Sequence, residues 1–336
     1  MSPRFVGWSA RSAARWAGRL KGGSRPPPMH SEMILVVGGT GNVGSVLVKT
    51  QLAAGTHVRV LTRDAKRAQA LRQSGAQVYV GDLRDADSLE RACRGVEKIF
   101  AGAHSFMGVG DAAPKSVDGS GNRALIDAAR FASVRRFVFI SSLGARPDHA
   151  IDFFRVKHET ETYLRASGLD FAILRPAPYM DAWAAQVGEP ILKDGRAKVF
   201  GRGSNPISFI AAADVAHFAG IAMRGDFSGQ TIELGGPEPL TMNEFASAFA
   251  RFGGRTAQIT HVTPAAMHLM AGVTGTMRPA YSRQVQTAIM LDTQPMTVDM
   301  TPLLARFPIL LQTVDEFIAA RYTRRGASSE RKPAPV

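Results

Sequence analysis

A glycine-rich turn between an apolar run and a helical pattern constrains the fold of this chain more than any other feature. Residues 34–44 read Ile-Leu-Val-Val-Gly-Gly-Thr-Gly-Asn-Val-Gly. Gly38 permits a tight turn out of a strand, Gly41 lets the backbone approach a pyrophosphate, and Gly44 lets the next helix lie close to the sheet. The free N–H groups at the start of that helix would then face the phosphates. The pattern predicts a dinucleotide-binding turn made of Gly38, Gly39, Thr40, Gly41, Asn42, Val43 and Gly44.

Short β-branched runs alternate with helical patterns from Met33 onward. The predicted strands cover residues 33–38, 57–62, 76–81, 96–102, 136–141 and 170–175. The predicted helices between them cover residues 43–54, 65–74, 87–94, 115–132 and 150–167. Because strands that alternate with helices form parallel sheets, the sequence predicts an α/β fold with a doubly wound parallel sheet of the Rossmann type. We assign residues 33–175 to this nucleotide-binding domain.

The regular alternation of strands and helices ends after residue 176, where prolines interrupt the pattern. The later elements are predicted as strands at 197–200 and 230–234, helices at 211–223 and from Thr241, an apolar helical region at 263–290, and a last helix from Thr313 to about Tyr322. We therefore expect a smaller α/β lobe over residues 176–322, interleaved with the sheet. Ligands of such folds bind at the carboxyl ends of the strands, in the crevice against the extra lobe.

The net charge of +13 comes mainly from the two ends of the chain. Residues 1–32 carry six Lys or Arg and one acid, and residues 321–336 carry five and one, which leaves +4 for the middle. Since the middle shows no interleaving of basic and aromatic residues, we expect no nucleic-acid partner for the core. No run of 18 apolar residues exists, so no membrane span is expected. Residues 323–336 are predicted to be a disordered basic tail.

Residues 1–32 lie outside the predicted fold and have two interpretations. They are rich in arginine and poor in acids, which is typical of a mitochondrial transit segment. Alternatively the true start is Met29 or Met33. The chain has one cysteine, Cys93, so a disulfide framework is impossible and a cytoplasmic location is expected, with the mitochondrion as the alternative. The histidines lack ligand spacing, so no metal site is predicted. The sequence leaves the oligomeric state open.

The end of the second predicted strand bears on the choice of cofactor. An acid at this position binds the ribose 2′-hydroxyl of NAD, whereas a cation pairs with the 2′-phosphate of NADP. Here Arg63 follows the strand, and Lys66 and Arg67 lie one turn further on. Asp64, the only acid, falls one residue late, where a helix cap is the simpler role. These cations favour NADP(H), with NAD(H) as the alternative cofactor and a solvated basic helix end as the structural alternative.

Six further segments indicate which family of dinucleotide-binding proteins the chain resembles. They are Gly81-Asp82-Leu83, Phe139-Ile-Ser-Ser142, Lys157-His-Glu-Thr-Glu, Leu174-Arg-Pro176-Ala-Pro-Tyr179, Pro206-Ile-Ser-Phe-Ile-Ala-Ala-Ala-Asp214 and Leu234-Gly-Gly-Pro-Glu-Pro. With the glycine turn, these segments resemble the NmrA-like group of atypical short-chain dehydrogenase/reductases. The resemblance covers residues 33 to about 255 well and the next 65 residues loosely. It implies that Asp82 and Leu83 border the adenine, that Ala101, Gly102 and Ala103 pass under the nicotinamide ribose, and that Lys157 and Pro176 also contact the cofactor.

The resemblance also implies catalytic positions. In the wider superfamily a tyrosine four residues before a lysine supplies a proton, and a serine after the fifth strand orients the carbonyl. Lys157 and Ser142 match, but Phe153 occupies the tyrosine position and has no ionisable proton. The remaining candidates are Lys157, Ser142 and Tyr179, with His104 as a weaker one. Each has a structural alternative: Lys157 can grip the ribose, Ser142 can cap the strand end, and Tyr179 can pack.

Three functions remain open at this point. The first is NADPH-dependent reduction of a small-molecule acceptor that needs little help with protonation, such as a quinone or another carbonyl-type compound. The second is a sensor of the NADP(H) ratio without turnover, and the third is an accessory or assembly role like that of the related subunit of respiratory complex I. An apolar wall for a flat acceptor is one interpretation of Met267, Met270, Val273, Met277, Tyr281 and Met290. The alternative is core packing, which is the commoner role of methionines at helical spacing.

Overall fold

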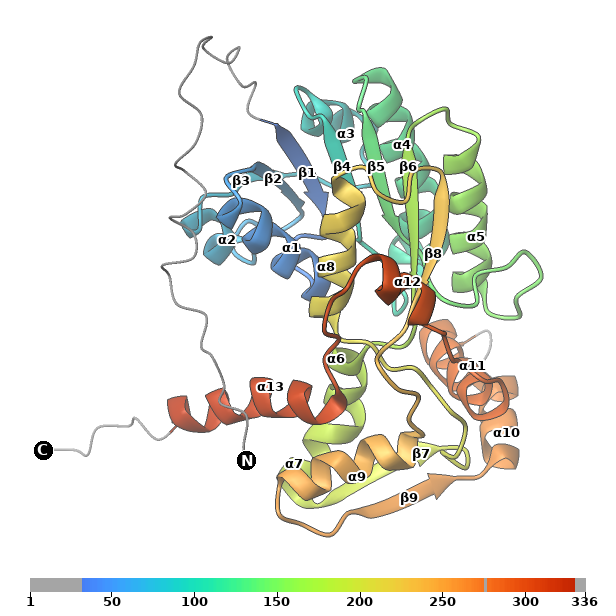
Figure 1. Ribbon diagram of the computed structural model, residues 1–336. Coiled ribbons are helices and arrows are strands. Elements are labelled where there is room, and N and C mark those ends of the chain that lie inside the picture. Colours follow the sequence, from blue (N-terminus) through green and yellow to red (C-terminus); the bar gives the residue numbers. More distant parts are fainter. Residues whose placement is uncertain (1–31, 275–276, 330–336) are drawn as a thin grey trace, which may run out of the picture. The chain divides into compact units, whose positions relative to one another are not determined.

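The computed structural model describes residues 32–274 and 277–329, and its centre is a parallel sheet (Figure 1). Seven strands lie in the order β3-β2-β1-β4-β5-β6-β8, and every neighbouring pair is parallel. The strands are β1 (Met33–Val37), β2 (His57–Thr62), β3 (Gln77–Val80), β4 (Lys98–Ala101), β5 (Arg136–Ile140), β6 (Phe171–Pro176) and β8 (Gln230–Leu234). The predicted doubly wound α/β fold is confirmed. The strand order reverses between β1 and β4, which is where such sheets bind ligands.

Helices cover both faces of the sheet (Figure 1). They are α1 (Asn42–Ala53), α2 (Gln69–Gln73) and α8 (Ala212–Met223) on one face, and α3 (Ala86–Cys93), α4 (Asn122–Phe131) and α5 (Asp152–Arg165) on the other. Successive strand residues point to opposite layers: Val36 packs with Leu47 of α1, whereas Leu35 packs with Leu125 of α4. All four side chains are fully buried, which explains the continuous apolar runs in the strands.

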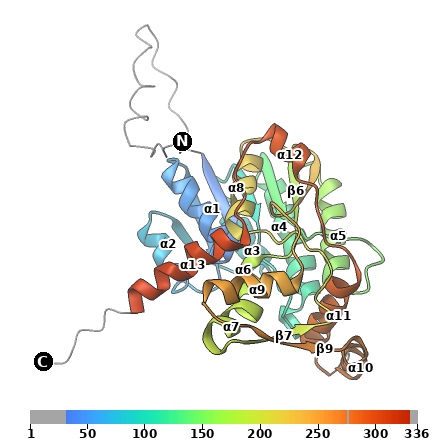
Figure 2. The same cartoon turned by 60° about the horizontal axis from the view of Figure 1, so that its bottom comes forward.

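The second half of the chain returns to the sheet and also builds a separate layer beyond its carboxyl edge (Figure 2). There β7 (Arg196–Phe200) and β9 (Gln258–Val262) form a two-stranded parallel sheet. Around them lie α6 (Met180–Trp183), the π-helix η4 (Ala184–Gly188), α7 (Glu189–Asp194), α9 (Met242–Phe252), α10 (Pro264–Thr274) and α11 (Pro279–Thr293). The chain continues through α12 (Thr301–Arg306) to α13 (Val314–Ser329).

Several predicted boundaries are wrong, and each has a physical reason. The helix expected at 65–74 begins only at Gln69, because Asp64 accepts a hydrogen bond from the backbone of Lys66 (2.8 Å) and holds a turn there. The helix expected at 115–132 begins as a π-helix, η3 (Lys115–Gly121), and the expected helical region at 263–290 is split into α10 and α11. Strand β9 was not predicted, because most of its residues are exposed.

The last helix begins as expected and ends later. Thr313 and Glu316 form reciprocal hydrogen bonds at its start. The helix runs to Ser329 rather than to about Tyr322, so residues 323–329 of the predicted tail belong to α13. Residues 330–336 and residues 1–31 lie outside the described part of the chain. None of the helices within residues 32–274 and 277–329 is long and apolar enough to span a bilayer.

Candidate active site

The glycine turn between β1 and α1 is pressed against the chain that leaves β4. Gly38 has a φ of +86°, and a Cβ there would lie 2.7 Å from the backbone nitrogen of Ala103 and 2.8 Å from the carbonyl carbon of Gly102. A Cβ at Gly44 would lie 2.3 Å from the carbonyl oxygen of Gly38. These positions therefore require glycine. The fold thus places the glycine turn in contact with residues 102–103, and the sequence analysis expected both segments to contact one cofactor.

The N-terminus of α1 has no side-chain cap, and the space next to it contains few protein atoms. Gly41 is the N-cap residue, no side chain caps the helix, and its first turn has no acid. The nearest protein atom to a Cβ on Gly41 would be the Gly38 carbonyl oxygen at 3.3 Å, so the outer side of Gly41 is free. The first N–H groups of a helix have no partner within the helix. Those of Asn42, Val43 and Gly44 are thus available to an anion such as a pyrophosphate. Gly39 packs behind them against Val60, and Thr40 is half-buried in the turn.

The three predicted cations stand together after β2. Arg63, Lys66 and Arg67 are all exposed, and within the described segments their side chains form no ion pair or hydrogen bond with protein. They do not line the main cavity. Three exposed cations within five residues of a strand end, none in an ion pair among the described residues, form a local positive patch, which suits a phosphate.

Asp82 and Leu83, at the exit of β3, line a separate broad hollow of about 630 Å³. Asp82 is held by Arg84, with Nε–Oδ1 and Nη2–Oδ2 distances of 3.0 and 2.6 Å. This hydrogen bonding lowers the pKa of Asp82, and Arg63 adds a smaller lowering. Leu83 is buried beneath the hollow. The hollow lies at the exit of β3, and that Asp82 and Leu83 border an adenine there stays a prediction.

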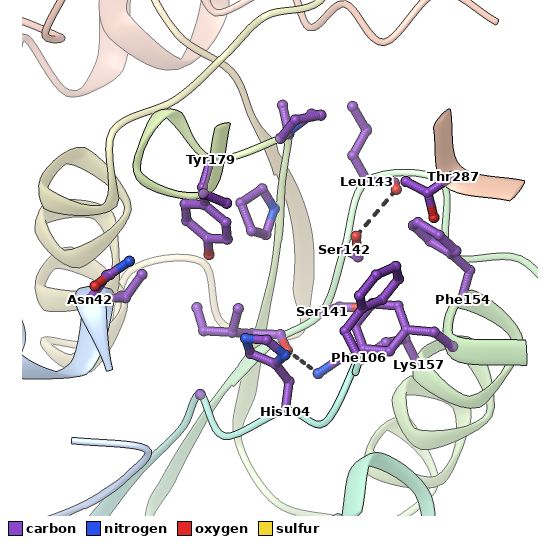
Figure 3. Close-up of a pocket in the computed structure, with 18 of the residues that line it drawn as sticks. Asn42, His104, Phe106, Ser141, Ser142, Leu143, Phe154, Lys157, Tyr179 and Thr287 are labelled. Carbon is purple, nitrogen blue, oxygen red and sulfur yellow. Dashed lines mark hydrogen bonds between the residues drawn. The ribbon is translucent and has the colours of Figure 1, made fainter. Parts of the chain in front are cut away.

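The main cavity has a volume of about 340 Å³ and lies at the carboxyl ends of β4, β5 and β6 (Figure 3). Of the residues expected at the site, it is lined by Gly38, Gly41, Asn42, Val43, Gly44, Gly102, Ser142, Lys157, Pro176 and Tyr179. Ala101 and Ala103 lie beside it in the β4 exit without lining it. The cavity therefore joins the glycine turn directly to the residues expected to do chemistry.

Lys157 is anchored by a buried carboxylate that the sequence analysis did not single out. Its Nζ lies 2.9 Å from Oδ1 of Asp118 and donates a hydrogen bond of 3.0 Å to the carbonyl oxygen of Ile140. The backbone of Ser105 donates to the other oxygen of Asp118 at 2.8 Å. Lys157 is 2% exposed and Asp118 is fully buried. The sequence could have indicated that Asp118 is buried, because positions 118, 122 and 125 lie on one face of a helix and Asn122 and Leu125 are also buried.

Phe153 stands in an aromatic group at the position where the superfamily has tyrosine. Its ring centre is 5.1 Å from that of Phe106 and 5.5 Å from that of Phe154, both nearly perpendicular. The Lys157 ammonium lies 5.5 Å from the Phe153 ring. The wall beside Lys157 is thus aromatic and carries no hydroxyl.

Several polar residues line the cavity, and Ser142, Tyr179 and His104 are those with a candidate role in chemistry (Figure 3). Ser142 makes only a long contact of 3.4 Å with a neighbouring carbonyl, whereas Ser141 is held by Glu161. The hydroxyl of Tyr179 has no hydrogen-bond partner in the described chain, and burial raises the pKa of Tyr179, so the group stays protonated. Burial also lowers the pKa of His104, and the Lys157 charge lowers it further, so the imidazole is neutral at pH 7.

The apolar wall is assembled differently from the prediction. Of the six expected residues only Met290 lines the cavity. Met267 packs into a separate cluster with Val285, and Met277 is 84% exposed. The side chain of Val273 lies outside the described residues. The wall comes instead from Trp183, Leu291 and Met296, because only one face of α11 turns toward the cavity.

No group of three metal-binding side chains occurs in the described part of the chain. The single cysteine is buried in α3, and burial raises the pKa of Cys93 to about 12. A thiol in that state is not a nucleophile at neutral pH.

Comparison with known proteins agrees with this geometry. An NAD(P)H azoreductase from Xenophilus azovorans is 32% identical over 69% of this chain and 77% of its own length. The photosystem II assembly factor Ycf39 of a Synechocystis strain is 28% identical over 82% of this chain and 85% of its own. Among solved structures, an NADPH-dependent quinone oxidoreductase from Escherichia coli superposes with a TM-score of 0.70 at 20% identity, covering 86% of this chain and 99% of the other. A triphenylmethane reductase from Citrobacter sp. with bound NADP(H) gives the same values.

These structural likenesses establish the fold. The NmrA-like family itself matches residues 30–291, which is most of the chain and includes the glycine turn, the cavity and Lys157. This chain belongs to the NmrA-like family.

Proposed function

We propose that this protein binds NADP(H) along the carboxyl edge of the sheet and reduces a small planar acceptor, a quinone or another carbonyl-type compound, in the main cavity. The observation that carries the proposal is the junction of an open helix N-terminus and an aromatic, apolar cavity in one site. The azoreductase relative and the structural likeness to a quinone oxidoreductase support the same class of reaction.

The cofactor would lie across features that are already near one another. The pyrophosphate would meet the N–H groups of Asn42, Val43 and Gly44, and the adenine would enter the hollow beside Asp82 and Leu83. Arg63, Lys66 and Arg67 would pair with the 2′-phosphate, which favours NADP(H) over NAD(H). Lys157, anchored by Asp118, would face the nicotinamide ribose near Gly102 and Pro176.

Bound NADPH would supply a hydride, and a quinone that takes up this hydride and one proton would become a hydroquinone. A quinone needs little help with protonation, because the negative charge left by hydride addition is delocalised over the ring. The neutral hydroxyl of Tyr179 faces the cavity without a protein partner and would donate a hydrogen bond to the acceptor oxygen. Ser142 would donate a second one. Water at the mouth of the cavity would supply the one proton that the reduction takes up.

The test is NADPH oxidation against a panel of quinones and aldehydes. We expect turnover of at least some quinones, weak or no turnover of aldehydes, and a loss of about 10²-fold in kcat for Tyr179→Phe with NADPH affinity unchanged. Tyr163→Phe is the matched control, since this tyrosine binds Asp127 on the surface. Tight NADPH binding without turnover of any acceptor would contradict the proposal.

A second candidate is a non-catalytic role as an NADP(H) sensor or assembly factor. Phe153 favours it, because the site lacks the superfamily's proton donor. The assembly-factor relative, which aligns with most of the chain, favours it as well. This role predicts tight cofactor binding, no turnover, and proteolytic protection that differs between NADP⁺ and NADPH.

A further inference from the structure

A second cavity adjoins the main one. It has a volume of about 120 Å³, several times the ~30 Å³ that a water molecule takes up in the liquid. The two cavities share three wall residues, Trp183, Gln186 and Leu291. The second cavity continues from these residues toward β7 and α9, away from the glycine turn. The two cavities therefore meet at these three residues.

The lining of the second cavity is mostly apolar. Val187, Val199, Ile207 and Met242 line it and are buried. The one carboxylate in its wall, Asp292, already accepts hydrogen bonds from the backbone of Arg202 (2.7 Å) and from that of Gly203 (3.2 Å). Lys198 also lines the cavity, but this residue is exposed to solvent. The buried part of the wall therefore offers an apolar group matching surface, and its carboxylate already has hydrogen-bond donors.

Two of the three shared wall residues, Trp183 and Gln186, are not fully buried. Trp183 is half-buried and Gln186 is exposed, and neither side chain has a hydrogen bond within the described residues. Both lie at the junction of α6 with the π-helix η4. π-Helical turns of this kind are frequent at functional sites, because the extra residue redirects side chains.

We propose that the second cavity binds an aliphatic tail of the acceptor, whose planar head lies in the main cavity, and that Trp183 forms the gate between the two. The inference rests on the proposed reductase function. An empty apolar space in a protein interior is unfavourable, and filling it with methylene groups removes them from water. The acceptor class is therefore a quinone-type ring with a saturated side chain of several carbons.

The first test is a series of quinones with one ring and saturated side chains of increasing length. We expect kcat/KM to rise about fourfold per methylene and then to level off when the cavity is full. Ala288→Leu should abolish the rise and leave the unsubstituted quinone unaffected, because Ala288 lines only the second cavity. Ala280→Leu, on the same helix but lining neither cavity, is the matched control and should keep the rise.

The second test does not need turnover. Trp183 is the only tryptophan of the described residues, so a Trp8→Phe, Trp16→Phe background makes it the sole reporter. We expect 4-alkylphenols with longer chains to change its fluorescence at lower concentration than phenol does, and Ala288→Leu to remove this difference. Normal turnover of the unsubstituted quinone with no dependence on chain length would overturn the inference and leave the reductase function intact. A tail-dependent Trp183 signal without turnover of any quinone would uphold the tail site and overturn the reductase.

Discussion

Gly41 is the residue at which cofactor binding and folding can be separated. Gly38 and Gly44 are needed by the fold itself, since a Cβ at either would lie within 2.7 Å of backbone atoms. At Gly41 the nearest atom would be 3.3 Å away and φ is −85°, so alanine fits with a small shift. Its methyl group would instead occupy the space in which a pyrophosphate approaches the turn.

We predict that Gly41→Ala raises the Kd for NADPH by about 10- to 100-fold, as expected for about 1–3 kcal/mol of overpacking. The melting temperature should change little. Gly220→Ala, inside α8 with its nearest neighbour at 3.7 Å, is the control and should leave the Kd unaltered. Equal NADPH affinity in both variants would show that the cofactor does not touch this turn.

The buried pair of Lys157 and Asp118 gives a second prediction. Asp118→Leu alone should destabilise the protein by about 3–5 kcal/mol, because it leaves a buried ammonium without its partner. Adding Lys157→Met should restore most of the stability in chemical denaturation. If Lys157 also holds the ribose, the stable double variant should bind NADPH about tenfold more weakly. Unchanged NADPH affinity in that variant would assign Lys157 a structural role alone.

Phe153 provides a gain-of-function test. Its ring already lies 5.5 Å from the Lys157 ammonium and against the cavity. Phe153→Tyr would add a hydroxyl beside a cation that lowers its pKa, which is the arrangement that drives carbonyl reduction in the wider superfamily. We expect measurable NADPH-dependent reduction of aldehydes by this variant and none by Phe154→Tyr. No gain would mean that the remaining site cannot position a carbonyl.

At the scale of elements, alternation of strands and helices predicts the fold well because the central strands of the large sheet, β1, β4 and β5, are buried on both faces. All six strands predicted before residue 176 exist, with ends that differ by at most two residues. Elements that lack a buried apolar pattern or regular α-helical geometry were not predicted. Strand β9 is half-exposed, and η3 departs from α-helical geometry in the segment that holds Asp118. Periodicity does not encode either feature.

Asp214, in the first turn of α8, affects the stability of the folded protein in a pH-dependent way. Burial raises the pKa of Asp214 to about 6, and Asp181 and Glu316 raise it further, against the hydrogen bond from Gln312. The folded state therefore holds this proton more tightly than the unfolded state does. Stability falls as the pH rises from about 4 to 6, and the loss persists above pH 6.

We predict that Asp214→Asn stabilises the protein by up to about 3 kcal/mol at pH 7, and that this gain vanishes near pH 4. Unfolding by urea at several pH values measures it. Glu238→Gln, an exposed acid, is the control and should show no such dependence. A gain that is equal at pH 4 and pH 7 would show that ionisation of Asp214 is not its cause.

For the molecule as a whole, the cavity is formed by segments that are far apart in the chain. The glycine turn, the exits of β4, β5 and β6, η4 and α11 all contribute to it. The sequence analysis predicted the part that carries a motif: the glycines, Ser142, Lys157, Pro176 and Tyr179. It did not predict Trp183 or Met296, because their roles arise from packing between elements and leave no local pattern. It also did not single out Asp118, although the helical spacing of this residue with Asn122 and Leu125 indicated a buried position.

The central claim is that this fold takes up a pyridine dinucleotide at the glycine turn. Isothermal titration of the folded protein with NADPH and with NADH tests it most directly. We predict one site per chain, with NADPH bound at least tenfold more tightly than NADH because of Arg63, Lys66 and Arg67. Tighter binding of NADH would contradict the role of these cations. No heat of binding with either nucleotide, for protein shown to be folded by circular dichroism, would contradict the entire functional account.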